Sequence, residues 1–238
     1  MKRFIAPLAV IVLAGIAPLA QATIQITYSV DGVLQPICSS VGQSVSCPDA
    51  TVTNLQIINL GASSNLTGEP TLALASSSDS ILHSLSGSHH IVIDVVAQGF
   101  TTPYTPPDLA FASHISTTVP VLAAASTFAF HSCVDTLDTL SGCPAVPGPP
   151  PYTSAVLNPN VATANSDNKD APILFIPSLV APYALDEQLD IWVGSGGRIN
   201  FSGSTTLTPV PEPMSIALLG GVVLLTSRLI RRKQNQAS

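Results

Sequence analysis

The stretch TIQITYSV, residues 23–30, alternates apolar and polar side chains with a period of two. One face carries only the large side chains of Ile24, Ile26, Tyr28 and Val30. Such alternation is typical of a β-strand that is buried on one side. Asp31-Gly32 follows directly and is a strong signal for a two-residue hairpin turn, after which Val33-Leu34 begins a returning strand. The stretch therefore predicts that the domain begins with a β-hairpin.

Short segments of this kind recur along the chain, separated by glycine and proline. We expect further strands at residues 51–60, 71–75, 80–85, 90–97, 114–125, 127–134, 173–176, 189–193 and 198–207. A slip in the alternation at Ile57-Ile58 predicts a β-bulge, and residues 109–112 predict one helical turn. No segment has a sustained helical period. We therefore predict an all-β fold, a single antiparallel β-sandwich of the immunoglobulin-like or jelly-roll-like kind, with Trp192 in its core.

A polar, proline-rich segment interrupts the strands between residues 142 and 170. Its first part, CPAVPGPPP at residues 143–151, contains too much proline for a sheet. The flanking halves are each small for an independent sandwich. We therefore expect one domain, residues 23–208, with a long excursion, and not a boundary between two domains.

The charged residues are distributed unevenly. Residues 23–213 contain all fourteen acidic residues and two of the eight basic ones, Lys169 and Arg198, which gives a net charge of −12. This balance provides no basic footprint for nucleic acid and no polybasic patch for anionic lipid. An acidic surface rich in serine and threonine suits solubility outside the cell or contact with cations.

The N-terminus has the three parts of a signal peptide. Lys2 and Arg3 are followed by an apolar segment at residues 4–19 and by the small-x-small site Ala20-Gln21-Ala22. We expect export through the Sec translocon and cleavage by signal peptidase before Thr23. Retention of residues 1–22 as an N-terminal anchor is the alternative.

The C-terminal segment, residues 209–238, has three parts in a fixed order. Val210-Pro211-Glu212-Pro213 precedes fourteen uncharged residues at 214–227, and a basic end follows that contains Arg228, Arg231, Arg232 and Lys233. Fourteen helical residues span roughly 21 Å, less than a hydrocarbon core of about 30 Å. Arg228 can snorkel to the membrane interface, and Leu229 and Ile230 extend the apolar segment. We therefore expect a transmembrane helix over about 214–230. The basic residues place that end in the cytoplasm.

The two prolines around Glu212 keep the motif extended and accessible to a processing enzyme. This order of motif, apolar segment and basic end resembles the PEP-CTERM protein-sorting signal over about the last 25–30 residues. Met214 and the scattered basic residues depart from the commonest form of that signal. An ordinary C-terminal anchor, with Pro-Glu-Pro as the end of a linker, is the alternative.

The resemblance implies a Gram-negative bacterium, an exosortase as processing partner and association with exopolysaccharide. It implies a protein that is held transiently in the inner membrane by its C-terminal helix and then delivered to the cell surface or extracellular matrix. The body is also similar, loosely, to β-sandwich passenger regions of other sorted proteins. We expect a structural or adhesive role there and no enzymatic activity.

Four cysteines form two local pairs, Cys38 with Cys47 and Cys133 with Cys143. Because export exposes them to an oxidising compartment, we expect two disulfides. Zinc binding is the alternative, but neither pair has C-x-x-C spacing, and His131 is the one histidine nearby.

The histidines are the first place to look for chemistry: His83, His89, His90, His114 and His131. His90 and Asp94 share one strand face, so a metal-dependent hydrolase that uses both with a further histidine is one alternative. The chain contains no H-E-x-x-H and no H-x-H motif, and histidines on strand surfaces explain the pattern. We therefore predict no catalytic residue, no metal and no cofactor.

A second alternative is a calcium- or glycan-binding adhesion module. Oxygen ligands for calcium could come from two acidic clusters, Asp135 with Asp138, and Asp186 with Glu187 and Asp190. The rings of Tyr104, Tyr152, Tyr183 and Trp192 could stack on a sugar, although aromatic residues are scarce and a core role is expected for them. The chain contains no G-x-S-x-G motif, and residues 194–197 (GSGG) predict a turn between strands.

Overall fold

The computed structural model describes residues 23–65, 68–69, 72–105, 107–139, 143, 152–161 and 166–211. The predicted signal peptide, residues 1–22, lies outside these ranges, as do the sorting motif beyond Pro211 and the predicted membrane segment. Among the described residues, no helix has the length and apolar character needed to span a bilayer. The account of the fold therefore concerns the predicted exported domain.

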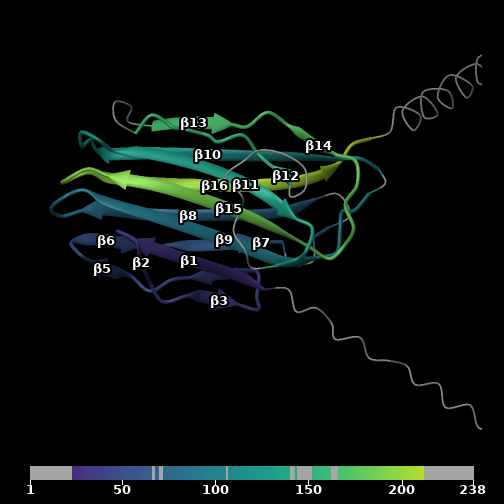
Figure 1. Cartoon of the computed structure of the whole chain (residues 1–238), viewed down its shortest axis with the longest axis horizontal. Helices are drawn as coiled ribbons and strands as arrows, with labels where there is room; N and C mark the ends of the chain where they lie inside the picture. Colours follow the sequence, from purple (N-terminus) through teal and green to yellow (C-terminus); the bar gives the residue numbers. More distant parts are fainter. Residues whose placement is uncertain are drawn as a thin grey trace, which may run out of the picture.

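The domain consists of two antiparallel sheets (Figure 1). Sheet A contains, in spatial order, β12 (Tyr152–Thr153), β11 (Thr127–Asp135), β15 (Tyr183–Val193), β9 (His89–Phe100), β1 (Ile24–Val30) and β2 (Val33–Leu34), with β3 (Cys38–Ser40) also paired to β1. Sheet B contains β13 (Ser166–Asp170), β10 (Leu109–Val121), β16 (Arg198–Pro209), β8 (Ala73–Ser84), β6 (Leu55–Ile58) and β5 (Ala50–Val52), with β14 (Leu174–Ile176) on β10, β7 (Gly61–Ser64) on β8 and β4 (Ser44–Ser46) on β7. The predicted all-β sandwich is confirmed.

The core lies between the two sheets and takes every second side chain from the long strands. In β1 the predicted face of Ile24, Ile26, Tyr28 and Val30 is buried. Phe128 of β11 packs edge-on against Phe201 of β16, with ring centroids 5.7 Å apart, and so joins the two sheets. Alternation along each strand thus supplies one apolar face to the core, as the sequence predicts.

Several local predictions are wrong. Residues 109–112 are the start of β10 and not a helical turn, because β10 pairs with β16 along almost its whole length. Residues 73–75 and 80–84, expected in two separate strands, belong to the single strand β8, and the expected excursion at 142–170 contains the paired strands β12 and β13. Ile57-Ile58 pair regularly with β8, and an irregularity in register lies instead between Ile199 and Phe201, opposite residues 79–82 of β8. In these cases pairing with a distant strand overrides the local pattern.

Trp192 is 44% exposed and not in the core.

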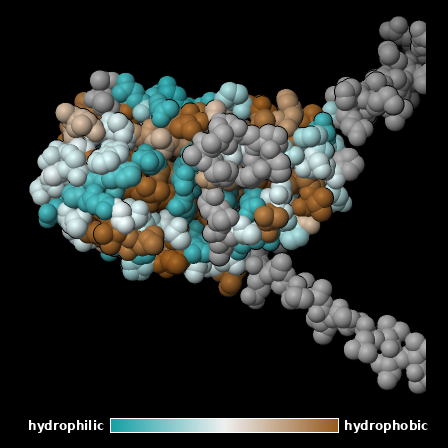
Figure 2. All heavy atoms as spheres, in the orientation of Figure 1, coloured by the Kyte–Doolittle hydropathy of each residue, from teal (hydrophilic) through white to brown (hydrophobic). Residues whose placement is uncertain are grey.

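Both ends of the described domain lie at the same end of the sandwich (Figure 1). Ile24, at the start of β1, pairs with Ala97 of β9, and Leu207, near the end of β16, pairs with Ala73 at the start of β8. The connections between β8 and β9 and between β15 and β16, each of which passes from one sheet to the other, lie at the opposite end. We call these the terminal end and the distal end. Side chains of opposite hydropathy are intermixed on the face that Figure 2 shows.

A carboxyl group lies inside the core. Glu187 of β15 is 1% exposed and accepts a hydrogen bond from Oγ1 of Thr205 across the sandwich, at 3.0 Å. A methyl group at Gly203 would lie 2.8 Å from Oγ of Ser77 and 3.0 Å from Cε2 of Phe130, so a glycine here leaves room for these side chains beside Glu187. Burial raises the pKa of Glu187 to about 7.

We predict that this carboxyl group makes the domain less stable as pH rises. The folded state binds the Glu187 proton more tightly than the unfolded chain does, so stability falls between the ordinary pKa of 4.5 and about 7. At about 1.4 kcal/mol per pKa unit, the loss is up to about 3 kcal/mol. Thermal unfolding at pH 5 and pH 8 should show a lower Tm at pH 8, and Glu187→Gln should reduce that difference.

The exposed Glu69→Gln is the matched control and should leave the pH dependence unchanged. Part of the difference should remain in Glu187→Gln, because burial also raises the pKa of Asp79 to about 7. A Tm difference in Glu187→Gln equal to that of the unaltered protein would contradict the assignment.

Candidate functional site

The outer face of sheet A carries polar and aromatic side chains in cross-strand rows. Strands β11, β15 and β9 lie side by side, and their register sets the rows Thr127–Trp192–His90, Ala129–Asp190–Val92, His131–Gln188–Asp94 and Cys133–Asp186–Val96. Directly opposite residues have Cβ atoms about 4.5–5.5 Å apart, so the members of a row can interact. The candidate site is this face.

Three residues of this face form a unit near the distal end. The rings of Trp192 and His90 are stacked, with centroids 4.6 Å apart and planes inclined by 13°. Nε2 of His90 lies 2.9 Å from Oδ1 of Asp190, so the carboxylate fixes the imidazole that supports the indole. We call Trp192, His90 and Asp190 the ring unit. It combines a large flat ring, 44% exposed, with a carboxylate whose side chain is 54% exposed.

The strand pattern explains why the ring unit faces outward. Leu189, Ile191 and Val193 of β15 are fully buried, so the residues between them must point to the other side. That alternation is the sequence signal for an exposed Trp192. The expectation that a tryptophan belongs in the core obscured it.

The next polar row is more deeply buried. Nε2 of Gln188 donates to Oδ1 of Asp94 at 2.7 Å. Burial raises the pKa of Asp94, and burial lowers that of His131, on the other side of Gln188. Nε2 of His131 is buried without a hydrogen-bond partner among the described residues. Burial in this row therefore favours the neutral forms of Asp94 and His131.

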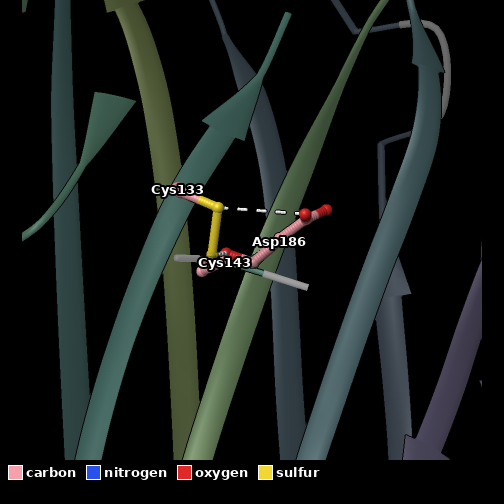
Figure 3. A group of neighbouring side chains, drawn as sticks. All are labelled: Cys133, Cys143 and Asp186. Atoms are coloured by element: carbon pink, nitrogen blue, oxygen red, sulfur yellow. Dashed lines mark hydrogen bonds between the residues drawn. A yellow bond between two sulfur atoms is a disulfide. The ribbon is translucent and has the colours of Figure 1, made fainter. Parts of the chain in front are cut away.

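The fourth row contains a disulfide. Figure 3 shows Cys133 and Cys143 joined, with Asp186 beside them. Burial, followed by the charges of Asp135, Asp94 and Asp138, raises the pKa of Asp186 well above its ordinary value. Oδ2 of Asp186 lies 3.8 Å from Sγ of Cys133. Since a disulfide sulfur carries no proton, a hydrogen bond between these atoms is donated by the protonated carboxyl group.

Both predicted disulfides are confirmed, Cys38–Cys47 and Cys133–Cys143. Within the described ranges, one group of three potential metal ligands comes close enough to hold an ion, and it consists of Cys133, Cys143 and Asp186. Its two sulfurs are bonded to each other, so neither is available as the thiolate that zinc requires. The zinc alternative therefore loses two of its three ligands.

The histidines that the sequence singled out have separate partners. His90 and Asp94 share the outer face of sheet A, as predicted, but bind Asp190 and Gln188 respectively. His89 lies at the distal end with Nδ1 2.8 Å from Oδ2 of Asp31. The side chains of His90 and Asp94 therefore share no partner in these hydrogen bonds.

On sheet B, His114 bonds through Nδ1 to Oδ1 of Asp170 at 2.7 Å. This pair lines a hollow of about 240 Å³. His83 lies beside Arg198 in the register of β8 and β16. Neither residue shares a face with the ring unit, which belongs to sheet A.

The predicted calcium clusters are divided by the fold. Asp135 accepts backbone hydrogen bonds from Leu137 and Thr139, and Asp138 accepts one from Gly99, so both cap a loop. In the second cluster, Glu187 points into the core, while Asp186 and Asp190 point outward. Adjacent residues of a strand cannot converge on one ion, because they face opposite sides of the sheet.

The tyrosine rings that could have met a sugar are mostly buried. Tyr183 is fully buried, where its hydroxyl donates to the Pro103 carbonyl at 2.9 Å, and Tyr152 is 9% exposed. Tyr104 is 54% exposed but lies at the terminal end, in the loop after β9. Trp192 is therefore the exposed ring of this set that is held by a stacked neighbour, His90, on the outer face of sheet A.

A hollow of about 590 Å³ lies beside the other disulfide and is lined by Tyr28, Ile37, Val45, Asp49 and neighbouring residues. It contains no exposed aromatic ring, because Tyr28 is 5% exposed. Asp49 in its wall accepts a hydrogen bond from the backbone of Asn59 at 2.9 Å. Its other polar side chains are those of Gln35, Ser39 and Ser46, and it lacks the stacked, exposed rings found on the outer face of sheet A.

Comparison with known proteins places the chain in no family. No family model matches it, and no curated protein matches it. Among solved structures, the chain is similar to TmCBM61 in complex with beta-1,4-galactotriose at a TM-score of 0.31 and 8% identity, over 63% of this chain and 87% of that one.

Two further solved structures show weaker likeness. An infectious bursal disease virus Gx strain structure has a TM-score of 0.25 and 9% identity, over 87% of this chain and 54% of that one. The structure of E. coli ycfD has a TM-score of 0.16 and 12% identity, over 96% of this chain and 52% of that one. None of the three likenesses is strong enough to support an inference about function.

We predict that both cysteine pairs stabilise the domain as disulfides and not as metal ligands. In the chain-entropy model, a loop of this size contributes about 3 kcal/mol. Replacing Cys133 and Cys143 with alanine should lower the free energy of unfolding by about that amount, measured by denaturant titration. EDTA should leave the Tm of the unaltered protein unchanged.

Cys38 and Cys47 provide a matched comparison, because the two pairs are separated by 9 and 10 residues. Their double replacement by alanine should have a similar effect on stability. Loss of stability on chelation, without loss on reduction, would overturn the assignment.

Proposed function

We propose that the domain is an exported, non-enzymatic module that binds glycan and serves an adhesive or structural role at the cell surface or in an exopolysaccharide matrix. The observation that carries the proposal is the ring unit. A sugar ring has an apolar C–H face that packs on an aromatic ring, and hydroxyl groups at its rim that bond to carboxylates. Trp192 and Asp190 offer both kinds of contact on one face.

The surroundings of the ring unit favour an extended ligand. Thr127, opposite Trp192, also lines a hollow of about 210 Å³ together with Asn158 and Asn160. The side chains of these residues can donate to and accept from sugar hydroxyls. A glycan chain lying across β11 could therefore contact the indole and the hollow together.

The position of the ring unit suits a module anchored by its termini. Both termini of the described domain lie at the terminal end. Trp192 and His90 lie near the distal end, since Trp192 is close to the end of β15 and His90 close to the start of β9. A module tethered at the terminal end would present the ring unit away from the membrane. The two disulfides fit an oxidising compartment outside the cytoplasm.

We predict that Trp192→Ala lowers affinity for polysaccharide about tenfold or more, because it removes the stacking surface. Affinity electrophoresis through gels that contain bacterial exopolysaccharide would measure this. Since Trp192 is the one tryptophan of the chain, its intrinsic fluorescence should also change on titration with oligosaccharide. The Tm should change little, because the indole is 44% exposed.

Tyr104→Ala is the matched control, since it removes a 54% exposed ring at the other end of the sandwich. It should bind as the unaltered protein does. Equal retardation of Trp192→Ala and the unaltered protein would contradict the proposed site.

We propose further that the C-terminal segment delivers this module as an exosortase substrate. The sequence resemblance supports this, and so does the place where the motif begins. The backbone N–H of Val210 donates to the Asp108 carbonyl at 2.8 Å, directly after the last strand ends at Pro209. The sorting motif therefore starts where the folded domain ends.

We predict that replacing Pro211 and Pro213 with alanine blocks processing, because the motif loses its fixed extended backbone. Immunoblots of membrane and extracellular fractions should then show an unprocessed, membrane-retained form, as in cells that lack the exosortase. Pro209→Ala, just outside the motif, should be processed normally. If the protein has the same size and location in exosortase-deficient cells as in normal cells, the proposed delivery by an exosortase is refuted.

A further inference from the structure

We propose that the ring unit selects a positively charged amino sugar over its neutral, N-acetylated form and over acidic sugars. This inference rests on the proposed glycan binding and names the ligand class. It is carried by the distribution of charge between the two sheets and by the open sides of Asp190 and Trp192.

The two sheets differ in their basic residues. Lys169 and Arg198, the only lysine and arginine in residues 23–211, lie on β13 and β16 and therefore both belong to sheet B. Sheet A thus presents carboxyl groups without any lysine or arginine among its described strands. A uronic acid, sulfate or phosphate group would meet no lysine or arginine on the described strands of this sheet and would be repelled by the acidic domain.

Asp190 is the carboxylate of sheet A that a ligand can reach. Glu187 lies in the core, Asp186 is 1% exposed, Asp135 is 8% exposed, and Oδ1 of the largely buried Asp94 accepts a hydrogen bond from Gln188. The side chain of Asp190 is 54% exposed, and among the described residues its one hydrogen bond joins Oδ1 to His90. Oδ2 is left for a donor from a ligand.

The geometry of the ring unit leaves space on one side. His90 stacks on one face of the Trp192 indole, from β9. On the other side, in β11, the residues opposite Trp192 and Asp190 are the small Thr127 and Ala129. A sugar that lies over these two residues can place its ring against the open indole face and an ammonium group next to Asp190.

An ammonium group gains more from this arrangement than a neutral amide does. An ammonium group forms an ion pair with a carboxylate in addition to a hydrogen bond, whereas an amide N–H donates a hydrogen bond without carrying a positive charge. The indole face also attracts a cation within about 6 Å. Acetylation removes the positive charge, and with it the ion pair and the attraction to the indole, while keeping the ring that stacks. The difference is expected to reach about tenfold in affinity.

Titration of the folded protein with three probes tests the proposal: a glucosamine tetramer, an N-acetylglucosamine tetramer and an oligoglucuronate. Trp192 fluorescence reports binding at the site, and calorimetry gives Kd. We expect the glucosamine tetramer to bind about tenfold tighter than the acetylated one, and the oligoglucuronate to bind weakest. Raising the ionic strength should weaken glucosamine binding selectively.

Asp190→Asn should bring the affinity for glucosamine down to that for N-acetylglucosamine, whose own affinity should change little. Asp170→Asn is a matched control, because Asp170 is also exposed and also bonded to a histidine, but on sheet B. It should leave all three affinities unchanged.

The outcomes separate this inference from the proposed function. Equal binding of the acetylated and free amino sugars, with Asp190→Asn without effect, would overturn the charge selectivity and leave glycan binding in place. Tightest binding of the oligoglucuronate would also overturn it. If no probe and no polysaccharide binds the folded protein, the proposed function itself fails.

Discussion

Strand β15 gives the domain two different chemistries because consecutive residues of a strand point to opposite sides of the sheet. Its inner side chains, among them Leu189 and Ile191, complete the core, while Asp190 and Trp192 between them face outward. β15 lies in the middle of sheet A, so hydrogen bonds to β9 and β11 fix its register on both sides. A shift of one residue would exchange the core and the outer face. The ring unit is therefore as well fixed as the core.

Charge in this domain is sparse, and burial decides how each carboxyl group behaves. Glu187 and Asp79 lie inside the sandwich, and burial raises the pKa of both to about 7. Asp190 is exposed and bonded to His90. Carboxyl groups thus lie in the core at Glu187 and Asp79, and on the exposed outer face of sheet A at Asp190. This division concentrates the accessible negative charge of sheet A beside Trp192.

The placement of the termini connects the fold to the proposed delivery. In an antiparallel sandwich, a chain that crosses the domain an even number of times ends at the side where it began. Here β1 begins and β16 ends at the terminal end (Figure 1). Val210 is hydrogen-bonded to the domain, so little chain separates the last strand from Pro211. A tether at this end leaves the distal end of the sandwich, and the ring unit near it, facing away from the tether.

Several features could be predicted from local sequence. The alternation of residues 23–30 determined a half-buried strand, Asp31-Gly32 a hairpin, and the spacing of the cysteines two local disulfides. These are properties of neighbouring residues, and the structure confirms them. The excess of acidic residues in the body is likewise a matter of composition. Local pattern could not show that residues 73–84 form one strand, because that length is set by pairing with β16.

The sequence by itself determined that this chain builds an acidic, disulfide-linked all-β domain, because period-two alternation, turn residues and charge are local properties. The alternation of β15 separates Glu187 and Trp192 onto opposite faces, but hydrophobicity alone places a tryptophan inside and a glutamate outside. Only the tertiary structure decided which face of β15 meets sheet B, so that Glu187 lies in the core and Trp192 outside it, and that His90 meets Asp190 from 100 positions away. The reason is that the register between distant strands fixes both outcomes.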